Sequence, residues 1–290
     1  MAKVLNVFNK IESLRERYYT VSTGKESLLT LIAEAEVAEQ VYNSNAIENS
    51  TLTLEETEKI LLQIDLDRYI SGREIFEAKN LAQVVSYTDK NAKKKELSLD
   101  IILFLHKILI SNIRDDIAGR FRKDNEYVRV GNHIAPVPKQ IIKRLEKMLS
   151  EYNASSHKNI IKRIAVFHLT FEYIHPFIDG NGRIGRAINN YLLIREGFVP
   201  INIKYADRGK YYNAFNEFDT AEKTSVMEEI IGKAITGSYH KRLAYMEGKE
   251  IITLANYAKQ NKISHSNLIN KANRQTIEAF LEKGIWKIGI

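Results

Sequence analysis

Hydrophobic side chains recur every three or four residues along most of the chain. This spacing is typical of helices that bury one face, and it is clear in four segments: residues 28–42, 142–152, 164–174 and 184–192. Two further helices carry start signals, because Thr53 and Glu56 form a capping-box pattern and Ser98 precedes the apolar residues 101–110. The pattern predicts a mainly α-helical fold.

Residues 126–135 do not follow the helical spacing. Polar and apolar side chains alternate in the first half, and Gly131 with Asn132 is a favourable pair for a tight turn. Pro136 follows soon afterwards and cannot donate a hydrogen bond to a neighbouring strand. We therefore predict a short β-hairpin whose second strand ends early.

Residues 251–290 have a pattern of their own. They contain short helical patterns, one of them capped by Ser264 or Ser266. Residues 277–281 also show helical spacing, which Gly284 ends, and the chain then finishes as a strand. We expect a small separate module here.

Composition narrows the function classes. The 290 residues include 43 Lys and Arg against 36 Asp and Glu, a formal charge of +7 that favours an anionic partner. The sequence contains no cysteine, which excludes disulfides, zinc–thiolate sites and cysteine nucleophiles. The longest apolar run, residues 101–110, is too short to span a bilayer, and the first residues lack the apolar core of a signal peptide. We expect a cytoplasmic protein without membrane association.

The strongest chemical signal is the segment 175–186, which reads HPFIDGNGRIGR. Pro176 disfavours helical geometry in the residue before it, so a helix should end near residue 174. Gly180 and Gly182 allow backbone N–H groups to converge, and the N-terminus of a new helix near Arg183 attracts anions. The loop is therefore suited to phosphate.

Side chains of the same segment supply the other groups that nucleotidyl transfer needs. His175 can accept a proton at neutral pH, and Asp179 offers an oxygen to a magnesium ion that bridges phosphates. Arg183, Arg186 and Asn190 share one narrow helix face at about 100° per residue, which suits a polyphosphate.

Two alternatives apply to this segment. Residues 180–185 match G-x-G-x-x-G, the dinucleotide-binding fingerprint, and residues 167–173 alternate like a strand. A dinucleotide fold, however, places the first glycine almost directly after the strand and repeats βαβ units, neither of which is visible here. The other alternative is a helix–turn–helix corner with exposed arginines. We favour the phosphate loop.

The segment 175–186 resembles the signature of the Fic family, His-Pro-Phe-x-Asp/Glu-Gly-Asn-Gly-Arg-x-x-Arg. The resemblance implies a Fic-type helical bundle over residues 97–215. It also implies an enzyme that transfers AMP from Mg-ATP to a Ser, Thr or Tyr hydroxyl of a target protein and releases pyrophosphate. His175 would then be the general base and Asp179 the Mg²⁺ ligand.

The resemblance also assigns the nucleotide-binding residues. Gly180, Asn181 and Gly182 would form the anion hole, while Arg183 and Arg186 would bind the β- and γ-phosphates. The phosphorylating branch of the family has lysine where this chain has Gly182, which favours AMP transfer.

Two neighbouring assignments complete the nucleotide site. Asn190 continues the arginine face along the helix, and Tyr212 lies in a stretch that resembles the adenine side of the family's pocket.

Residues 44–49 resemble the family's inhibitory motif, Ser/Thr-x-x-x-Glu-Gly/Asn. Ser44 and Glu48 would share a helix face, and Glu48 could pair with Arg186 and deny that arginine to the γ-phosphate. This implies the class with an N-terminal inhibitory helix. The alternative is an ordinary surface glutamate at a helix end.

The predicted hairpin resembles the family's target-binding flap, whose exposed edge pairs with an extended target segment. The alternative is a hairpin that only faces solvent. The flap residues would be Val128, Val130, Gly131, Asn132, His133 and Ile134.

These assignments divide the chain into four segments. They are an N-terminal helical region with the inhibitory helix (1–96), the Fic core (97–215), connecting helices (216–250) and a winged-helix-like module (251–290). The module has six basic residues against Glu278 and Glu282, so it could bind DNA phosphates or dock a protein. A helix that carries those two glutamates would read a DNA groove poorly.

Rival functions follow from these features. One is a DNA-binding regulator whose Fic core only senses nucleotide. Another is a bifunctional enzyme that also removes AMP, with Glu48 orienting a water molecule. Oligomerisation of the chain is left open.

Overall fold

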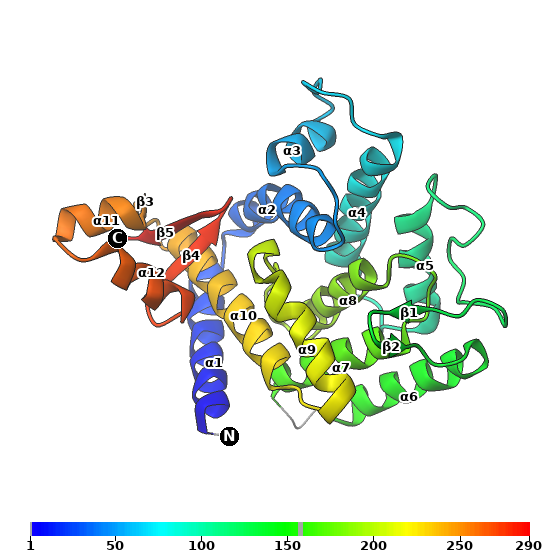
Figure 1. The fold of residues 1–290 in the computed structure, drawn as a ribbon. Helices are drawn as coiled ribbons and strands as arrows, with labels where there is room; N and C mark the ends of the chain where they lie inside the picture. Colours follow the sequence, from blue (N-terminus) through cyan, green and yellow to red (C-terminus); the bar gives the residue numbers. More distant parts are fainter. Residues whose placement is uncertain (1, 156–158) are drawn as a thin grey trace. The chain divides into compact units, whose positions relative to one another are not determined.

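The computed structural model describes residues 2–155 and 159–290, so Met1, the first residue of the predicted N-terminal region, lies outside the described residues. Helices predominate (Figure 1). The helices are α1 (Ala2–Ser22), α2 (Glu26–Ile47), α3 (Leu54–Leu62), α4 (Gly72–Asn91), α5 (Leu99–Ile110), α6 (Ile141–Ala154), α7 (Ile160–Ile174), α8 (Asn181–Arg195), α9 (Arg208–Ala221), α10 (Ser225–Met246), α11 (Leu254–Asn261) and α12 (His265–Asn273). The strands are β1 (Arg129–Val130), β2 (His133–Ile134), β3 (Ile251–Thr253), β4 (Ala279–Glu282) and β5 (Ile285–Gly289).

Contacts between residues divide the chain into two compact units, each built from separate stretches. The first unit comprises residues 1–36, 199–202 and 229–290, and the second comprises residues 37–198 and 203–228. Helices α2 and α10 each pass from one unit into the other. The four segments expected from the sequence are consecutive stretches of chain, whereas these units combine separate stretches, so the division into four segments stays a prediction.

Helix α8 lies at the centre of the second unit, packed against α4, α5 and α7. Its side chains Ile184, Ile188 and Tyr191 are fully buried. Local signals start the surrounding helices: Thr53 makes the expected capping box on α3, and Ser98 accepts the N–H of Ile101 at the start of α5. The predicted mainly α fold is confirmed.

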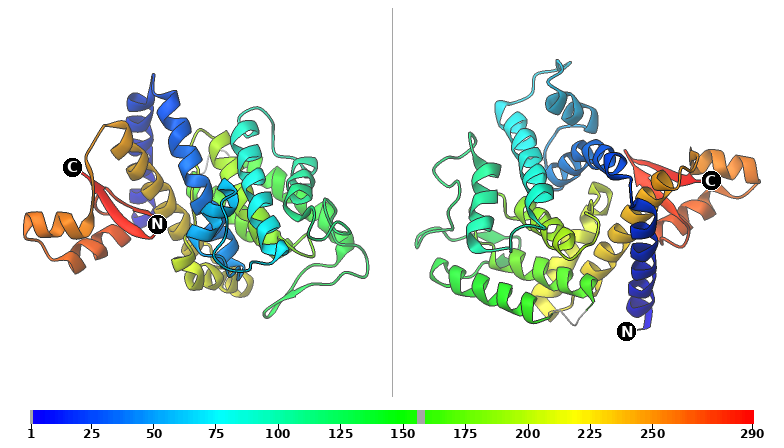
Figure 2. Two further views of the ribbon diagram at one scale, coloured as in Figure 1. Left: turned by 90° about the horizontal axis from the view of Figure 1, so that it is seen from above. Right: turned by 180° about the vertical axis from the view of Figure 1, so that it is seen from behind.

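The predicted hairpin is present and short. Strands β1 and β2 are antiparallel, with Arg129 opposite Ile134 and Val130 opposite His133. Gly131 at the turn has a φ of 59°, which favours glycine. In the view from above in Figure 2, the green segment that carries the hairpin extends outwards from the neighbouring helices.

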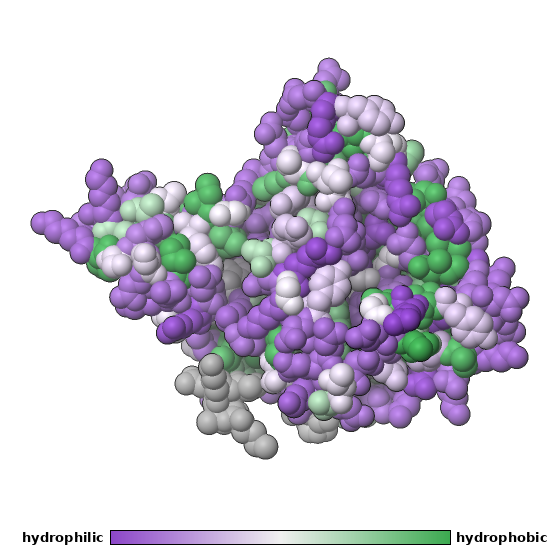
Figure 3. All heavy atoms as spheres, in the orientation of Figure 1, coloured by the Kyte–Doolittle hydropathy of each residue, from purple (hydrophilic) through white to green (hydrophobic). Residues whose placement is uncertain are grey.

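Among residues 2–155 and 159–290, no helix combines the length and the hydropathy that crossing a bilayer requires. On the face seen in Figure 3, hydrophilic residues predominate and apolar residues form small groups.

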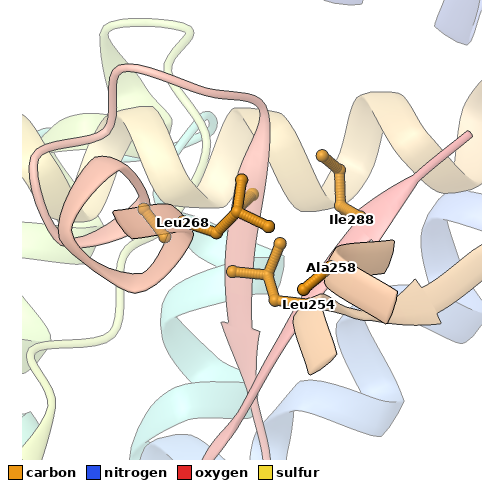
Figure 4. Close-up of a cluster of buried hydrophobic side chains, with 6 residues drawn as sticks. Leu254, Ala258, Leu268 and Ile288 are labelled. Atoms are coloured by element: carbon orange, nitrogen blue, oxygen red, sulfur yellow. The ribbon is translucent and has the colours of Figure 1, made fainter. Parts of the chain in front are cut away.

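In the first unit, residues 251–290 form a three-stranded antiparallel sheet, order β3-β5-β4, with α11 and α12 between the first two strands in sequence. Their shared core is a cluster of six buried apolar residues, four of which are labelled in Figure 4: Leu254, Ala258, Leu268, Ala272, Ala279 and Ile288. Ser264 caps α12, one of the two caps expected. The order strand, two helices, hairpin suits the winged-helix-like interpretation, which stays a prediction.

The helix expected over residues 277–281 is wrong, because residues 279–281 belong to strand β4, which pairs with β5. Lys283 and Gly284 both have positive φ, 49° and 77°, so they form a hairpin turn where a helix end was expected. Apolar spacing over only five residues does not distinguish a helix from a strand, and pairing with β5 decides. Helix α8 likewise begins at Asn181, two residues before the expected start at Arg183.

Three buried histidines contribute to the cores of the two units. His106 on α5 stacks on Phe177 with ring centroids 3.7 Å apart, and burial lowers its pKa to about 4. Burial also lowers the pKa of His168 on α7 to about 3 and that of His240 on α10 to about 4. These imidazoles are therefore neutral over the physiological pH range.

We expect the free energy of unfolding to fall as the pH decreases from 6.5 towards 4. Unfolded histidines protonate with a pKa near 6.5, whereas His240 stays neutral down to about pH 4, so protons bind the unfolded state preferentially in this window. Above pH 6.5 the stabilisation is complete. Each buried histidine of this kind lowers the free energy of unfolding by roughly 2 kcal/mol between pH 6.5 and about pH 5.

Urea unfolding at neutral pH and near pH 5 measures this loss. The variant His240→Gln should lose part of the pH dependence, whereas His265→Gln, at an exposed position, should keep it. An unchanged pH dependence in His240→Gln would contradict the assignment.

Candidate active site

The loop between α7 and α8 is shaped by its own residues. Helix α7 ends at Ile174, before Pro176 as expected, and His175 takes the left-handed conformation with a φ of 48°. The Asn181 side chain accepts the N–H of Phe177 at 2.9 Å and donates to its carbonyl at 2.9 Å. Because this amide is occupied, Asn181 closes the loop, and its backbone N–H is the group left to face an anion.

Helix α5 holds the other side of the loop. The Nδ1 atom of His106 accepts the N–H of Gly119 at 3.1 Å, so its Nε2 carries the proton and donates to the carbonyl of Asp179 at 3.1 Å. A Cβ atom at Gly180 would lie 3.0 Å from the Leu109 side chain, and the φ of Gly180 is 83°. Glycine is thus required where the loop lies against α5.

Arg122, which is 4% exposed, connects this loop to the base of the hairpin. Its guanidinium donates to the carbonyls of His175 at 2.8 Å, Glu126 at 2.8 Å and Pro136 at 2.9 Å. Burial lowers the pKa of Arg122, although the group stays cationic. One buried cation therefore holds together backbone segments from two functional elements.

Arg186 on α8 is 8% exposed and is bound from two sides. Its Nε donates to Ser44 Oγ at 2.9 Å, and its Nη2 donates to the Ser44 carbonyl at 2.8 Å and to Glu48 Oε1 at 2.9 Å. Its Nη1 donates to Tyr211 Oη at 3.1 Å, and that hydroxyl lies 2.7 Å from His168 Nε2. Because Arg186 donates to the tyrosine oxygen, the Tyr211 hydroxyl donates its own hydrogen bond to Nε2 of the neutral His168.

The Glu48 carboxylate also lies over the first turn of α8. A Cβ atom at Gly182 would be 2.1 Å from Glu48 Oε1 and 3.1 Å from Arg186 Nη1. No side chain fits there without displacing the glutamate. Glu48 therefore occupies both the arginine and the helix N-terminus that an anion would use.

Helix α9 holds the end of α2 in this position. The Ile47 carbonyl accepts hydrogen bonds from Tyr212 Oη at 3.1 Å and Arg208 Nε at 2.9 Å. Lys204, which precedes α9, also pairs with Glu39 at 2.6 Å; Glu39 lies on α2, eight residues before Ile47. The segment that carries Glu48 is thus fixed by contacts additional to Arg186.

The Glu172 carboxyl group on α7 and the His175 imidazole directly after that helix both have shifted pKa values. Burial lowers the pKa of His175 to about 4, so its imidazole is neutral at physiological pH. Burial, reinforced by the charge of Glu48, raises the pKa of Glu172 to about 8. The Glu172 Oε2 atom lies 3.9 Å from His175 Nδ1, and within the described residues its Oε1 has no hydrogen-bond partner.

A cavity of about 360 Å³ joins these groups. Seven residues singled out from the sequence line it: Glu48, Val130, Gly131, His133, His175, Gly182 and Tyr212. Its other lining residues are Leu169, Glu172, Tyr173, Tyr211, Phe215, Asn216, Phe218 and Asp219. The hairpin is held at its rim by His133, whose ring nitrogens each lie 2.8 Å from an oxygen, one of Asp219 and one of the Tyr173 backbone.

The remaining predicted residues lie outside this lining. Val128, Asn132 and Ile134 belong to the hairpin segment, and Asn190 is half-buried on the third turn of α8. Arg183 and Arg186 share a helix face as expected but bind different elements.

Arg183 pairs with Glu77 of α4 at 3.3 Å and with Asp179 at 3.0 Å. Asp179 also pairs with Arg73 at 3.1 Å, and its side chain is 30% exposed.

The fit of a magnesium ion depends on Asp179. Within the described residues no group of three or more His, Asp or Glu side chains could hold a metal ion. Mg²⁺ is commonly bound by one or two carboxylates together with substrate phosphates and water. A single, partly exposed carboxylate in the loop between α7 and α8 fits such a nucleotide-borne ion.

Four important groups were not found from the sequence: Arg122, His106, Glu172 and Tyr211. A signal existed for one of them, because His168, Glu172 and His175 recur at spacings of four and three along an otherwise apolar helix. Buried polar side chains in such a row require partners. Arg122, His106 and Tyr211 become apparent only through their contacts with residues distant in the sequence.

Comparisons with known proteins agree with this geometry. Residues 96–193 match the Fic/DOC family. A protein adenylyltransferase Fic of Nematostella vectensis is 30% identical over 222 residues, 73% of this chain and 50% of that protein. The protein of the same name from Drosophila willistoni is 32% identical over 221 residues, 70% of this chain and 43% of that protein. The chain spans about half the length of these curated relatives or less.

Solved structures have the same fold. A Fic domain containing signaling protein of Bacteroides thetaiotaomicron superposes with a TM-score of 0.74 at 21% identity, covering 83% of this chain and 97% of that one. A Fic family protein of Desulfovibrio desulfuricans gives a TM-score of 0.70 at 19% identity, covering 100% and 96%. Through the domain at residues 96–193, with its helical bundle and hairpin, the chain belongs to the Fic/DOC family.

Proposed function

We propose that this protein transfers AMP from ATP to a hydroxyl group of a target protein. The observation that carries the proposal is the single cavity in which neutral His175, Gly182 at the N-terminus of α8 and the hairpin residues Val130 and His133 meet. The name of the relatives, protein adenylyltransferase Fic, supports the same reaction.

In this mechanism the target hydroxyl oxygen attacks the α-phosphorus of ATP. His175 accepts the hydroxyl proton, the new P–O bond forms, and the bond to the β-phosphate oxygen breaks, which releases pyrophosphate. The neutral state of His175 leaves it ready to take that proton. The backbone N–H groups of residues 181–183 and the positive end of α8 would bind phosphate oxygens.

Magnesium would be held by Asp179 together with the phosphates, and it would neutralise their charge. Asp179 must then exchange its ion pair with Arg73 or Arg183 for the metal, which its partial exposure allows. After this exchange Arg183 would still be paired with Glu77 of α4, and it would have to leave that partner as well to turn towards a phosphate.

We further propose that Glu48 inhibits the reaction. Its carboxylate occupies Arg186 and the space above Gly182, the two places where the terminal phosphates would bind. ATP that bound with Glu48 in place would have its α-phosphate misplaced for attack, and misplacement of the reacting atoms by about 1 Å can cost about a hundredfold in rate.

We expect Glu48→Gly to raise self-labelling from α-labelled Mg-ATP by at least about tenfold. The charged hydrogen bond between the partly exposed Glu48 carboxylate and buried Arg186, worth roughly 1.5–3 kcal/mol, is then lost and Arg186 is released from it. Glu48→Gln, which keeps the shape but not the charge, should give a smaller rise. The combination Glu48→Gly with His175→Ala should abolish labelling, and labelling that survives it would contradict the role of His175 as base.

Arg208→Ala should raise self-labelling by less than Glu48→Gly does. It removes one of the two donors to the Ile47 carbonyl and so weakens the hold on α2 without touching Arg186. Arg144→Ala on α6 is the matched control, because among the described residues the Arg144 side chain bonds only to Gln140. Equal labelling in Arg208→Ala and wild type would show that α9 does not help to hold the inhibitory segment.

The labelling rate of Glu48→Gly should be level from about pH 8 down to about pH 5 and fall below that. Because burial lowers the pKa of His175 to about 4, the base stays deprotonated well below the usual histidine range. Circular dichroism at each pH distinguishes this fall in labelling rate from unfolding. Loss of half of the labelling rate near pH 6.5 would contradict the lowered pKa of His175.

A further inference from the structure

The stretch from Ile251 to Ile277 contains no aspartate or glutamate. It forms β3, α11 and α12 and carries four cationic side chains: Lys259, Lys262, Lys271 and Arg274. All four are exposed. A surface of one charge sign over two consecutive helices favours an anionic partner.

The two acidic residues that follow this stretch do not weaken its charge. Glu278 pairs with Arg17 at 2.6 Å and Lys249 at 3.5 Å. Glu282 pairs with Lys241 at 2.7 Å and Lys287 at 2.7 Å. Each glutamate is thus paired with two cations inside the first unit. Since residues 279–282 are strand β4, the helix that would have presented these glutamates to a groove does not exist.

Helix α12 has one apolar face and one polar face. Leu268 and Ala272 are buried in the cluster of Figure 4. The rest of the helix surface is largely exposed and carries amide, hydroxyl and basic groups at Ser266, Asn267, Asn270 and Lys271, and exposed Arg274 follows the last helical residue. In the part of the chain that the structure describes, no hydrogen bond or ion pair engages the side chains of Asn267, Asn270, Lys271 or Arg274.

We propose that α12 binds in the major groove of double-stranded DNA. The major groove admits an α-helix, and Asn side chains can bond adenine there, so Asn267 and Asn270 would contact base edges. Lys271 and Arg274 at the end of α12 would contact phosphates. Helix α11 precedes α12 by a short turn, the arrangement in which the second helix enters the groove.

The chemistry of the face favours duplex DNA over other anions. An acidic protein would be bound by the four cations but would gain little from the amides of Asn267 and Asn270. Duplex RNA has a deep and narrow major groove that a helix does not enter. In Figure 3 the surface over α11 and α12, at the left, is mostly hydrophilic, as a wet DNA interface requires.

The test uses the full chain and a labelled random-sequence duplex of about 20 base pairs, two helical turns. Fluorescence anisotropy is measured over a range of salt concentrations for wild type and for Lys271→Ala/Arg274→Ala. The matched control, Lys93→Ala/Lys94→Ala, removes the same charge from an exposed segment of the second unit. None of these residues belongs to the proposed active site, so self-labelling by Mg-ATP should be unchanged.

We expect the α12 variant to bind the duplex at least about tenfold more weakly than wild type, and the control to bind as wild type does. Loss of two phosphate contacts should also reduce the slope of log affinity against log salt by about 2. When the duplex sequences that bind best are selected from a random pool, Asn270→Ala should lose the base preference that wild type shows at one position.

Three results would overturn the proposal. They are absence of salt-dependent duplex binding by the full chain, equal weakening in the two double variants, and preference for single-stranded or RNA competitors over duplex DNA. DNA binding is measured without nucleotide, so its failure leaves the proposed AMP transfer untouched, and failure of AMP transfer leaves this proposal untouched.

Discussion

The architecture of the site depends on one buried guanidinium. Arg186 has lost almost all contact with water, and a buried cation is tolerated only when anions or strong acceptors surround it. Ser44 and Glu48 meet this need from one side and Tyr211 from the other. Because the requirement is for negative charge and not for glutamate as such, a nucleotide phosphate can satisfy it equally well. In the proposed function, inhibition by Glu48 and binding of the nucleotide are therefore two alternative ways to neutralise the same buried cation.

The position of His175, the proposed general base, depends on a second buried cation and on backbone geometry. Arg122 binds the carbonyl of His175 and that of Pro136 next to the hairpin, so the proposed base and the proposed target-binding hairpin share one support. Burial keeps His175 neutral. Neighbouring Glu172 is kept protonated by burial and by the charge of Glu48, which avoids two adjacent carboxylates in the cavity. Removal of Glu48 would therefore also change the electrostatics around the base.

The two units handle anions differently. In the second unit the cations are buried, paired and prearranged around one cavity, which suits a small polyphosphate. In the first unit the glutamates of the C-terminal module are paired with cations, and the exposed helices keep only positive charge. Charges on that surface interact through water and are screened by salt.

The sequence alone determined the helices with clear caps, such as α3 and α5, the end of α7 before Pro176, the turn at Gly131, and the family through residues 175–186. These signals act between residues within about four positions of each other. Only the tertiary structure decided that residues 279–282 form a strand, since that depended on pairing with β5. It also supplied the contacts of Arg122 with His175, His106 with Asp179 and Tyr211 with Arg186, which join residues 25 to 73 positions apart. Burial and long-range pairing depend on how the helices pack, and no local pattern encodes which distant group will neutralise a buried charge.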